Sequence, residues 1–270
     1  MEGQWIRLNR LFSGSRRAVI VAVDHGEFFG PTPGIIDLPE AIQSLTEADG
    51  VLLSPGMMSH CGSFFAQRNA PQAIVRLNWS TVYCFQWGYD QARTATIVSP
   101  AEALALGADI ALASLTLSGT DQQMDRDNVA QFAEIVSQKR HAGIPLIGEF
   151  YPINPEQMAP EQLHKLVYQA CRILAELGAD AIKTYYTGED FAEVVQSCPV
   201  PIFTLGAEKT PKEIDALNLA YKAIRSGARG VVFGRNVIQA NSPSRFLQGL
   251  KKVVKEDADP EAVAREYNLR

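Results

Sequence analysis

The stretch LGADAIKTY, residues 177–185, contains the pattern that decides the fold. An apolar stripe with helical spacing ends here, Gly178 suits the left-handed position that follows a helix, and an apolar, strand-like run comes next. The same order recurs in LGADIAL (106–112) and SGARGVVFG (226–234), and HAGIPLIGEF (141–150) is a related version. Repeated helix-to-strand junctions of this kind indicate a chain of alternating helices and strands.

Eight short apolar runs follow one another along the chain. Most are rich in valine, isoleucine, leucine and alanine and do not alternate with polar residues, which is typical of buried parallel strands. They are AVIVAVD (18–24), GVLLS (50–54), AIVRLN (73–78), DIALAS (109–114), PLIGEF (145–150), DAIKTY (180–185), PIFTL (201–205) and GVVFG (230–234).

The length of the chain favours a closed barrel over an open sheet. An open doubly wound sheet uses the same junctions, but a barrel of eight such units typically needs about 250 residues, and this chain has 270. No Gly/Ser linker or low-complexity run divides the sequence. We therefore predict an α/β fold, a TIM (β/α)₈ barrel that forms one domain over residues 1–270.

Two helices can be placed in detail. Residues 160–177 carry one apolar stripe, with Pro160 suited to the first helical position and Gly178 to the C-cap. A second helix is expected to open at Thr210 with a capping box, in which Thr210 and Glu213 satisfy each other's free backbone donors, and to stop at Gly227.

Composition excludes several classes of protein. Hydrophobic residues make up 46% of the chain, enough to form a sizeable core. The net charge of −5 argues against a surface that binds nucleic acids or anionic membranes. No run reaches the roughly 20 apolar residues that a membrane span requires, and the first residues lack a signal-peptide core. The four cysteines form no CxxC pair and are expected to be free thiols. These features predict a cytoplasmic protein.

Lys183 is the most informative candidate for chemistry. Functional residues of a parallel barrel lie at the carboxyl ends of its strands, and this lysine stands inside an apolar run. Burial disfavours an ammonium ion, so a buried lysine can supply a nucleophilic amine that forms an iminium ion with a ketone. The alternative is a lysine that reaches from a strand end to pair with Asp24 or Glu149.

Three further side chains are expected at the same end of the barrel. Asp24 directly follows the first run, so its carboxylate could polarise substrate hydroxyls or transfer protons. The alternative is that it only caps the turn before Gly26. Hydrogen bonding inside the barrel suits His25 better than direct catalysis. Tyr151 precedes a proline that constrains its backbone, and its phenol is a candidate acid or base, with simple packing as the alternative.

The loops after the last two runs are candidates for a phosphate site. TIM barrels often bind phosphate there. Gly206 and Gly234 would let the backbone approach an anion, and Arg235 adds a fork-shaped cation. The four histidines form no HxH or HExxH motif, and no GxGxxG follows the first run, so we expect no metal ion and no cofactor.

Taken together, five stretches resemble the archaeal-type class I fructose-1,6-bisphosphate aldolases. That family includes 2-amino-3,7-dideoxy-D-threo-hept-6-ulosonate synthases and autoinducer-2 phosphate thiolases. The matching stretches occur in family order and span most of the chain. They are VAVDHGEFFGPTPG (21–34), GEFYP (148–152), LGADAIKTYYTG (177–188), CPVPIFTLGAEKT (198–210) and GARGVVFGRNVIQ (227–239).

The resemblance implies a role for each candidate residue. Lys183 would form the Schiff base, Tyr151 would be the general acid and base at the cleaved bond, and Asp24 would assist proton transfer. The glycines after the seventh and eighth strands and Arg235 would hold a substrate phosphate. The implied activity is reversible cleavage of a phosphorylated ketose, such as fructose 1,6-bisphosphate, to dihydroxyacetone phosphate and an aldehyde, in a homo-oligomer.

The sequence also departs from the family pattern. The family usually has GGPK after the seventh strand, whereas this chain has Gly206, Ala207, Glu208 and Lys209, which adds a methyl group and a negative charge to the expected phosphate loop. The region after the third run is unusually aromatic and suits a specificity loop or an oligomer contact. Transaldolase, amino-keto acid synthase and thiolase activities remain alternatives, as does a non-catalytic sugar-phosphate binder. The tyrosine at 151 favours an aldolase over a thiolase.

Overall fold

In the computed structural model, which describes residues 2–12 and 14–269, eight parallel strands close into a barrel. The order around the barrel is β1-β10-β9-β8-β7-β6-β3-β2, so each strand pairs with its neighbours in the chain once the short pair β4–β5 is set aside. The strands are β1 Ala18–Ala22, β2 Gly50–Leu53, β3 Gln72–Arg76, β6 Ile110–Ser114, β7 Leu146–Glu149, β8 Ala181–Thr184, β9 Ile202–Leu205 and β10 Gly230–Phe233. Each lies inside or within one residue of its predicted run, so the predicted TIM barrel is confirmed.

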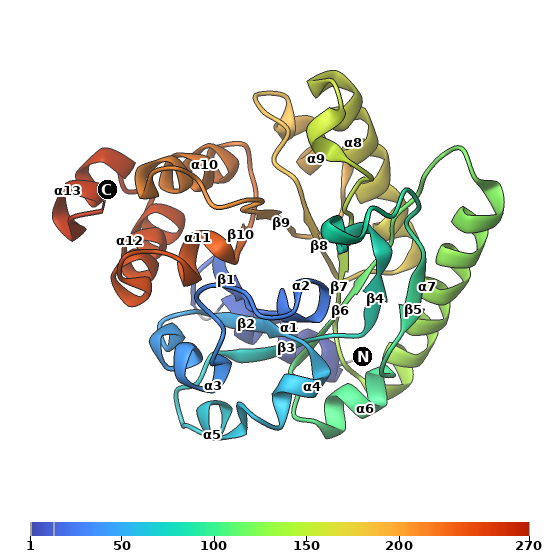
Figure 1. Ribbon diagram of the computed structural model, residues 1–270, viewed down its shortest axis with the longest axis horizontal. Coiled ribbons are helices and arrows are strands. Elements are labelled where there is room, and N and C mark those ends of the chain that lie inside the picture. The colour runs from blue at the N-terminus through green and yellow to red at the C-terminus, as the bar shows by residue number, and fades with distance from the viewer. Residues whose placement is uncertain (1, 13, 270) are drawn as a thin grey trace.

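Helices surround the barrel on its outer side (Figure 1). The longer ones are α7 Gln122–Ala142, α8 Pro160–Leu177, α10 Glu213–Arg225, α12 Pro243–Glu256 and α13 Pro260–Tyr267. The shorter outer ones are α3 Leu38–Ala41, α4 Pro55–Met58, α5 Gly62–Phe65, α6 Pro100–Ala105 and α9 Phe191–Ser197. Two further short helices, α2 Gly26–Phe29 and α11 Arg235–Ile238, lie instead where the strands end. The predicted limits of α8 are confirmed, with Pro160 as its first residue and Gly178 at φ 112° as its C-cap.

The interior of the barrel is apolar at one end and charged at the other. Alternate strand residues such as Ile20, Ile74 and Phe203 form an interior cluster, and Leu11 and Phe12 at the end of α1 (Glu2–Phe12) join it. The ring of Phe12 stacks on that of Phe203, with centroids 5.9 Å apart. Since α1 closes this end, a ligand must enter where the strands end, which is where the charged side chains lie.

The capping box predicted at the start of α10 is wrong. The N-cap is Lys212 and the helix begins at Glu213, two residues later than expected, and the backbone N–H of Lys212 donates to the Asp215 carboxylate at 3.3 Å. Thr210 instead donates its N–H to Oδ1 of Asn236 at 2.8 Å, while the Glu213 carboxylate accepts from the N–H of Asn241 at 2.9 Å. Contacts with the segment after β10 therefore replace the local pairing.

An arm over the mouth of the barrel was not predicted. Residues 78–96 form the antiparallel pair β4 (Asn78–Ser80) and β5 (Thr94–Thr96), with two turns of 3₁₀ helix between them, Thr81–Tyr83 and Phe85–Trp87. We call this segment the β4–β5 arm. It carries the aromatic residues noted in the sequence and packs with Phe28 and Met124 in a separate apolar cluster. The aromatic region is therefore, at least in part, a cover for the mouth.

Two smaller expectations can be compared with the structure. All four cysteines are buried and free, as predicted (Cys61, Cys84, Cys171 and Cys198). Among residues 2–12 and 14–269, no helix has the length and apolar character needed to cross a bilayer.

Candidate active site

The eight residues predicted to form the site all line one cavity at the carboxyl ends of the strands. Lys183 comes from β8, Asp24 and His25 from the turn after β1, and Tyr151 from the loop after β7. Gly206 and Ala207 follow β9, and Gly234 and Arg235 follow β10. Phe28, Arg76, Tyr83, Phe85 and Glu149 also line this cavity.

Lys183 is buried in the cavity and paired with a carboxylate. Its side chain is only 8% exposed, and its Nζ lies 2.5 Å from Oε1 of Glu149. The two residues are direct neighbours in the pairing of β7 with β8. The two expectations for this lysine, a buried amine and a partner of Glu149, thus describe the same side chain.

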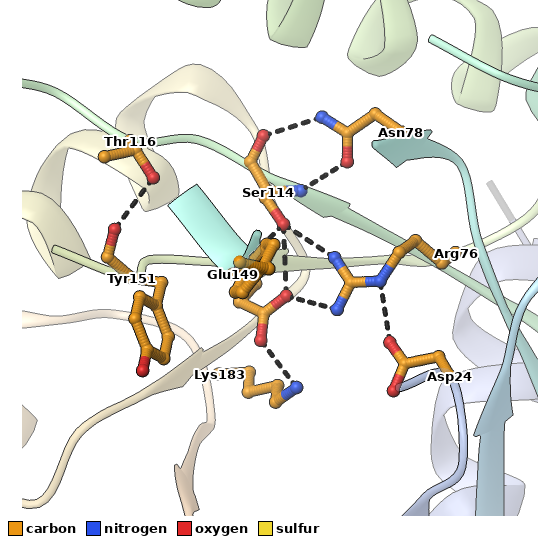
Figure 2. Close-up of polar contacts among 9 residues, drawn as sticks. Asp24, Arg76, Asn78, Ser114, Thr116, Glu149, Tyr151 and Lys183 are labelled. Atoms are coloured by element: carbon orange, nitrogen blue, oxygen red, sulfur yellow. Dashed lines mark hydrogen bonds and ion pairs between the residues drawn. The ribbon is translucent and has the colours of Figure 1, made fainter. Parts of the chain in front are cut away.

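Arg76 is the centre of the site and was not predicted. This last residue of β3 is 2% exposed. Its Nε donates to Oδ2 of Asp24 at 2.7 Å, its Nη2 to Oε2 of Glu149 at 2.6 Å, and its Nη1 to Oγ of Ser114 at 2.7 Å. Figure 2 shows the guanidinium between the two carboxylates, with Lys183 on the far oxygen of Glu149. One side chain therefore links the strands β3, β6 and β7 with the turn after β1.

The arginine also stabilises both carboxylates in their charged form. Burial opposes the ionisation of Asp24, but the charges of Arg76 and Lys183 outweigh it and lower the pKa of the carboxyl. The same balance holds at Glu149, where burial is again opposed by Arg76 and Lys183 and the pKa falls to about 2. The site thus contains two ionised carboxylates around one guanidinium, in an environment shielded from water.

A second set of contacts fixes this network to the backbone of β6. Ser114 donates its hydroxyl to Oε2 of Glu149 at 3.1 Å, and the Tyr83 hydroxyl lies 2.9 Å from the same serine oxygen. Asn78 forms two hydrogen bonds of 2.8 Å with the backbone N–H and C=O of Ser114. The Arg76 guanidinium carbon also lies 5.0 Å from the ring centre of Tyr83, a cation–π distance. The carboxylates are therefore held rigidly before any ligand arrives.

Tyr151 stands at the outer side of the cavity among other aromatic rings. Its ring centre is 5.0 Å from that of Tyr83 and 5.1 Å from that of Tyr185. Burial raises the pKa of Tyr151 to about 12, although a hydrogen bond with Tyr185 partly opposes this. Its backbone is fixed because Thr116 donates its hydroxyl to the Tyr151 carbonyl at 2.8 Å. At neutral pH the phenol keeps its proton and can donate it.

His25 is a neutral residue packed against a required glycine. Burial is the main reason that its pKa falls to about 4, and nearby cations including Lys183 contribute. A Cβ atom at Gly234 would lie 2.2 Å from Cε1 of His25 and 2.9 Å from the carbonyl oxygen of Ala22. Any side chain at 234 would therefore displace both the histidine and the start of the loop after β10.

The predicted phosphate loops contain one cation and one strained residue. Arg235 donates from Nη2 to the carbonyl of Ala207 at 3.1 Å, and its Nε is buried without a hydrogen-bond partner among the described residues. Ala207 has φ 49°, a left-handed conformation that costs a non-glycine residue about 1–2 kcal/mol. Glu208 is exposed and its Oε1 lies 3.9 Å from Nη1 of Arg235. The carboxylate that Glu208 adds to this loop therefore lies close to the guanidinium of Arg235, the cation expected to bind a phosphate.

Glu27 is a buried acid close to the site, and it predicts a pH effect on stability. Both of its carboxylate oxygens are buried without a hydrogen-bond partner among the described residues. Burial raises its pKa from 4.5 to about 8; Arg76 opposes this, whereas Asp24 and Glu149 add to it. Between these pH values the folded state holds a proton that the unfolded state has lost, so stability should fall as the pH rises.

The substitution Glu27→Gln should remove this pH dependence. We expect little change in melting temperature at pH 5, where the folded acid is already neutral, and a clear increase at pH 8.5. Differential scanning calorimetry of the wild type and the variant at both pH values measures these changes in melting temperature. Glu161→Gln, an exposed first-turn acid of α8, is the matched control and should have a small effect at either pH. An equal shift for Glu27→Gln at both pH values would contradict the assignment.

A parallel barrel with a buried lysine amine in its mouth has the architecture of the class I aldolases, and the comparisons with known proteins agree. A family model described as DeoC/LacD family aldolase matches residues 18–240. The chain belongs to this family of aldolases, and it is an enzyme of the carbon–carbon lyase class.

Individual relatives are similar over almost their whole length. An uncharacterized aldolase of Saccharolobus solfataricus is 30% identical over 96% of this chain and 97% of its own. A 3-hydroxy-5-phosphonooxypentane-2,4-dione thiolase of Yersinia pseudotuberculosis is also 30% identical, over 96% of this chain and 85% of its own. A similar solved structure is that of an archaeal fructose-1,6-bisphosphate aldolase with its catalytic lysine bound to a carbinolamine intermediate. Its sequence is 28% identical to this chain, and the two structures superpose with a TM-score of 0.76 over 92% of this chain and 98% of the other.

Proposed function

We propose that this protein is a metal-independent class I aldolase that reversibly cleaves a phosphorylated ketose through an iminium ion on Lys183. The observation that carries the proposal is the position of the Lys183 amine, which is buried, faces the cavity and touches Glu149 at 2.5 Å. Fructose 1,6-bisphosphate, the substrate that names the aldolases of similar structure, is the reference substrate.

The network around Lys183 suits each stage of iminium formation. The unprotonated amine attacks the ketone carbonyl to give a carbinolamine. A proton transferred to the carbinolamine hydroxyl then lets it leave as water, which gives a cationic iminium. Glu149 is fixed and ionised, so it stabilises this cation without reorganisation. Asp24 uses Oδ2 to bind Arg76, which leaves Oδ1 to accept a hydrogen bond from a substrate hydroxyl.

Tyr151 suits the proton transfer at the cleaved bond. In the cleavage direction a base removes the proton of the hydroxyl on the carbon beyond the bond, that carbon leaves as an aldehyde, and the electron pair moves to the iminium to form an enamine. Protonation of the enamine and hydrolysis then release the ketone. In the condensation direction a phenol whose pKa is about 12 is a proton donor for the new alkoxide.

The phosphate of the ketone half is assigned to the loops after β9 and β10. Arg235 is the cation of the cavity lining on this side, and its Nε has no hydrogen-bond partner among the residues that the structure describes. A planar guanidinium is well suited to phosphate oxygens. The neighbouring Gly206 and Gly234 keep the backbone close to the same part of the cavity.

Chemical trapping of the iminium tests the proposal directly. The protein is incubated with dihydroxyacetone phosphate or fructose 1,6-bisphosphate in the presence of EDTA, reduced with sodium borohydride and analysed by intact mass and peptide mapping. The expected result is one adduct of the mass of the reduced ketone, located on Lys183. If neither substrate yields an adduct, the proposed chemistry is wrong.

Thiolytic cleavage is the second candidate, because one relative at 30% identity is a thiolase. A thiolase transfers an acyl group to a thiol, so its turnover requires a thiol acceptor, whereas an aldolase releases an aldehyde without one. Turnover of a phosphorylated diketone that depends on an added thiol, together with no cleavage of phosphorylated ketoses, would favour this candidate.

The substitution Tyr151→Phe separates iminium formation from bond cleavage. We expect the borohydride adduct with dihydroxyacetone phosphate to persist, while cleavage of fructose 1,6-bisphosphate slows by about 10²–10⁴-fold, the range for loss of a general acid or base. Single-turnover kinetics measure the cleavage step. Tyr185→Phe is the matched control, since it removes a neighbouring phenol but not the proposed proton donor. Unchanged cleavage by Tyr151→Phe would remove Tyr151 from the mechanism.

A further inference from the structure

A second hollow opens directly outside the catalytic cavity. This outer pocket is formed by the β4–β5 arm, the loop 151–157 and Tyr185, and it shares the walls Phe85, Tyr151 and Ala207 with the catalytic cavity. The catalytic cavity and the outer pocket therefore adjoin each other at the open end of the barrel, with the catalytic cavity on the inner side.

Tyr151 lies at the boundary between the two hollows, because it lines both of them. The ketone half must reach Lys183 on the inner side, where Arg235 also lies. If Tyr151 exchanges a proton with the hydroxyl beyond the cleaved bond, the carbons of the aldehyde half extend outward from Tyr151. They then occupy the outer pocket, so its walls select the aldehyde.

The outer pocket has no basic wall residue and three acidic ones. Among the described residues that line it there is no lysine, arginine or histidine, but Asp90, Glu156 and Glu208 are present. Burial is the main cause that raises the pKa of Tyr151; Glu156 on the outer side adds to this rise, and Arg235 on the inner side opposes it. The nearby Lys209 lines a different hollow, on the side of Phe29 and Pro33.

The remaining walls are uncharged; aromatic and aliphatic side chains predominate, and Thr81, Gln91, Asn154 and Gln157 add neutral polar groups. Phe85, Tyr89, Tyr151 and Tyr185 contribute rings, and Ile153 contributes an aliphatic side chain. Such walls favour contact with uncharged surface. A phosphate here would bring a charge of about −1.5 to −2 next to carboxylates. None of the described residues that line the pocket is a cation, and the neighbouring Arg235 is already 3.9 Å from the Glu208 carboxylate.

We propose that the aldehyde partner of this enzyme is uncharged, with an apolar or aromatic body, and that it does not carry a phosphate. The inference rests on the proposed function and names the substrate class of its second half. The natural ketose is then phosphorylated only at the end that contacts Arg235.

A matched pair of aldehydes tests the proposal. With dihydroxyacetone phosphate as the donor, the condensation kcat/KM is measured for D-glyceraldehyde 3-phosphate and for D-glyceraldehyde, which differ only in the phosphate, and for phenylacetaldehyde. Both uncharged aldehydes should exceed the phosphorylated one by about tenfold or more, and the ratio should narrow in 0.5 M NaCl because salt screens exposed carboxylates. Equal or faster use of the phosphorylated aldehyde, or no condensation with either uncharged aldehyde, overturns the inference.

Failure of the inference can be distinguished from failure of the proposed function. Dihydroxyacetone phosphate forms its borohydride adduct on Lys183 without any aldehyde. If no adduct forms, the proposed function itself fails; if the adduct forms and the phosphorylated aldehyde is preferred, only the inference fails.

A charge reversal in the outer pocket gives a second test. Glu156→Lys should shift the selectivity ratio toward D-glyceraldehyde 3-phosphate by about fivefold or more, because it places a cation where none lies. The control is Glu261→Lys, which makes the same charge change at an exposed residue of the outer helix α13 and should leave the ratio unaltered. An identical ratio in the Glu156 variant and the control overturns the electrostatic argument.

Discussion

Replacement of Lys183 by methionine should abolish turnover and remove the borohydride adduct together. Methionine preserves most of the volume of the side chain but supplies no amine, so the ketone has no nucleophile with which to form an iminium. We expect kcat for ketose cleavage to fall by about 10⁴-fold or more, because the covalent route is lost as a whole. Steady-state kinetics measure the loss of turnover, and the intact mass after borohydride reduction measures the loss of the adduct in the same preparation.

A second buried lysine provides the matched control. Lys139 on α7 is 2% exposed, and its Nζ lies 2.5 Å from Oδ2 of Asp180, a pairing like that of Lys183 with Glu149. It lies outside the cavity lining. Lys139→Met should therefore lower stability yet keep the adduct. An adduct that survives in Lys183→Met would move the Schiff base to another lysine and contradict the assignment.

The same sequence signal that singled out Lys183 was present at Arg76. Both are charged residues inside apolar runs, IKTY and AIVRLN, where burial without a partner is unfavourable. The arginine was overlooked because its partners are distant in sequence, 52 residues away at Asp24 and 73 at Glu149. Closure of the barrel brings these strand ends together, and spacing along the chain does not reveal which side chains then meet.

Local sequence patterns predicted the secondary structure correctly where burial determines it. They failed where a contact with a distant part of the chain replaced the local hydrogen bonds. The strands were predictable because each is buried on both faces and therefore apolar throughout. The capping box at Thr210 failed because Asn236, from the segment after β10, offered the same donor a better-placed acceptor. The β4–β5 arm has strands of three residues each, too short for a pattern of alternation to indicate them.

Loss of Arg76 should have the largest effect on stability of any single change in the site. Arg76→Met would leave Asp24 and Glu149 buried with Lys183 as their main remaining cation, and it would remove three hydrogen bonds of 2.6–2.7 Å. Removing one partner of a buried ion pair typically costs about 3–5 kcal/mol of unfolding free energy. Urea denaturation at pH 7, followed by circular dichroism, measures this loss.

Arg76→Lys distinguishes the charge of this residue from its geometry. A lysine keeps the positive charge but lacks the planar fork that contacts Asp24, Glu149 and Ser114 at once. We therefore expect it to recover part of the stability lost in Arg76→Met.

The pH dependence of activity in these variants tests whether Arg76 positions the active carboxylates. With less positive charge beside them, the pKa values of Asp24 and Glu149 should rise, since Arg76 is the largest influence that lowers both. The acidic limb of the activity profile should then move to higher pH in Arg76→Met and return toward its wild-type position in Arg76→Lys, which restores the charge. General destabilisation would not produce such a shift. If stability and the pH profile of Arg76→Met both matched the wild type, the two carboxylates would not depend on this arginine, and the rigid charged network would have no part in stabilising the iminium.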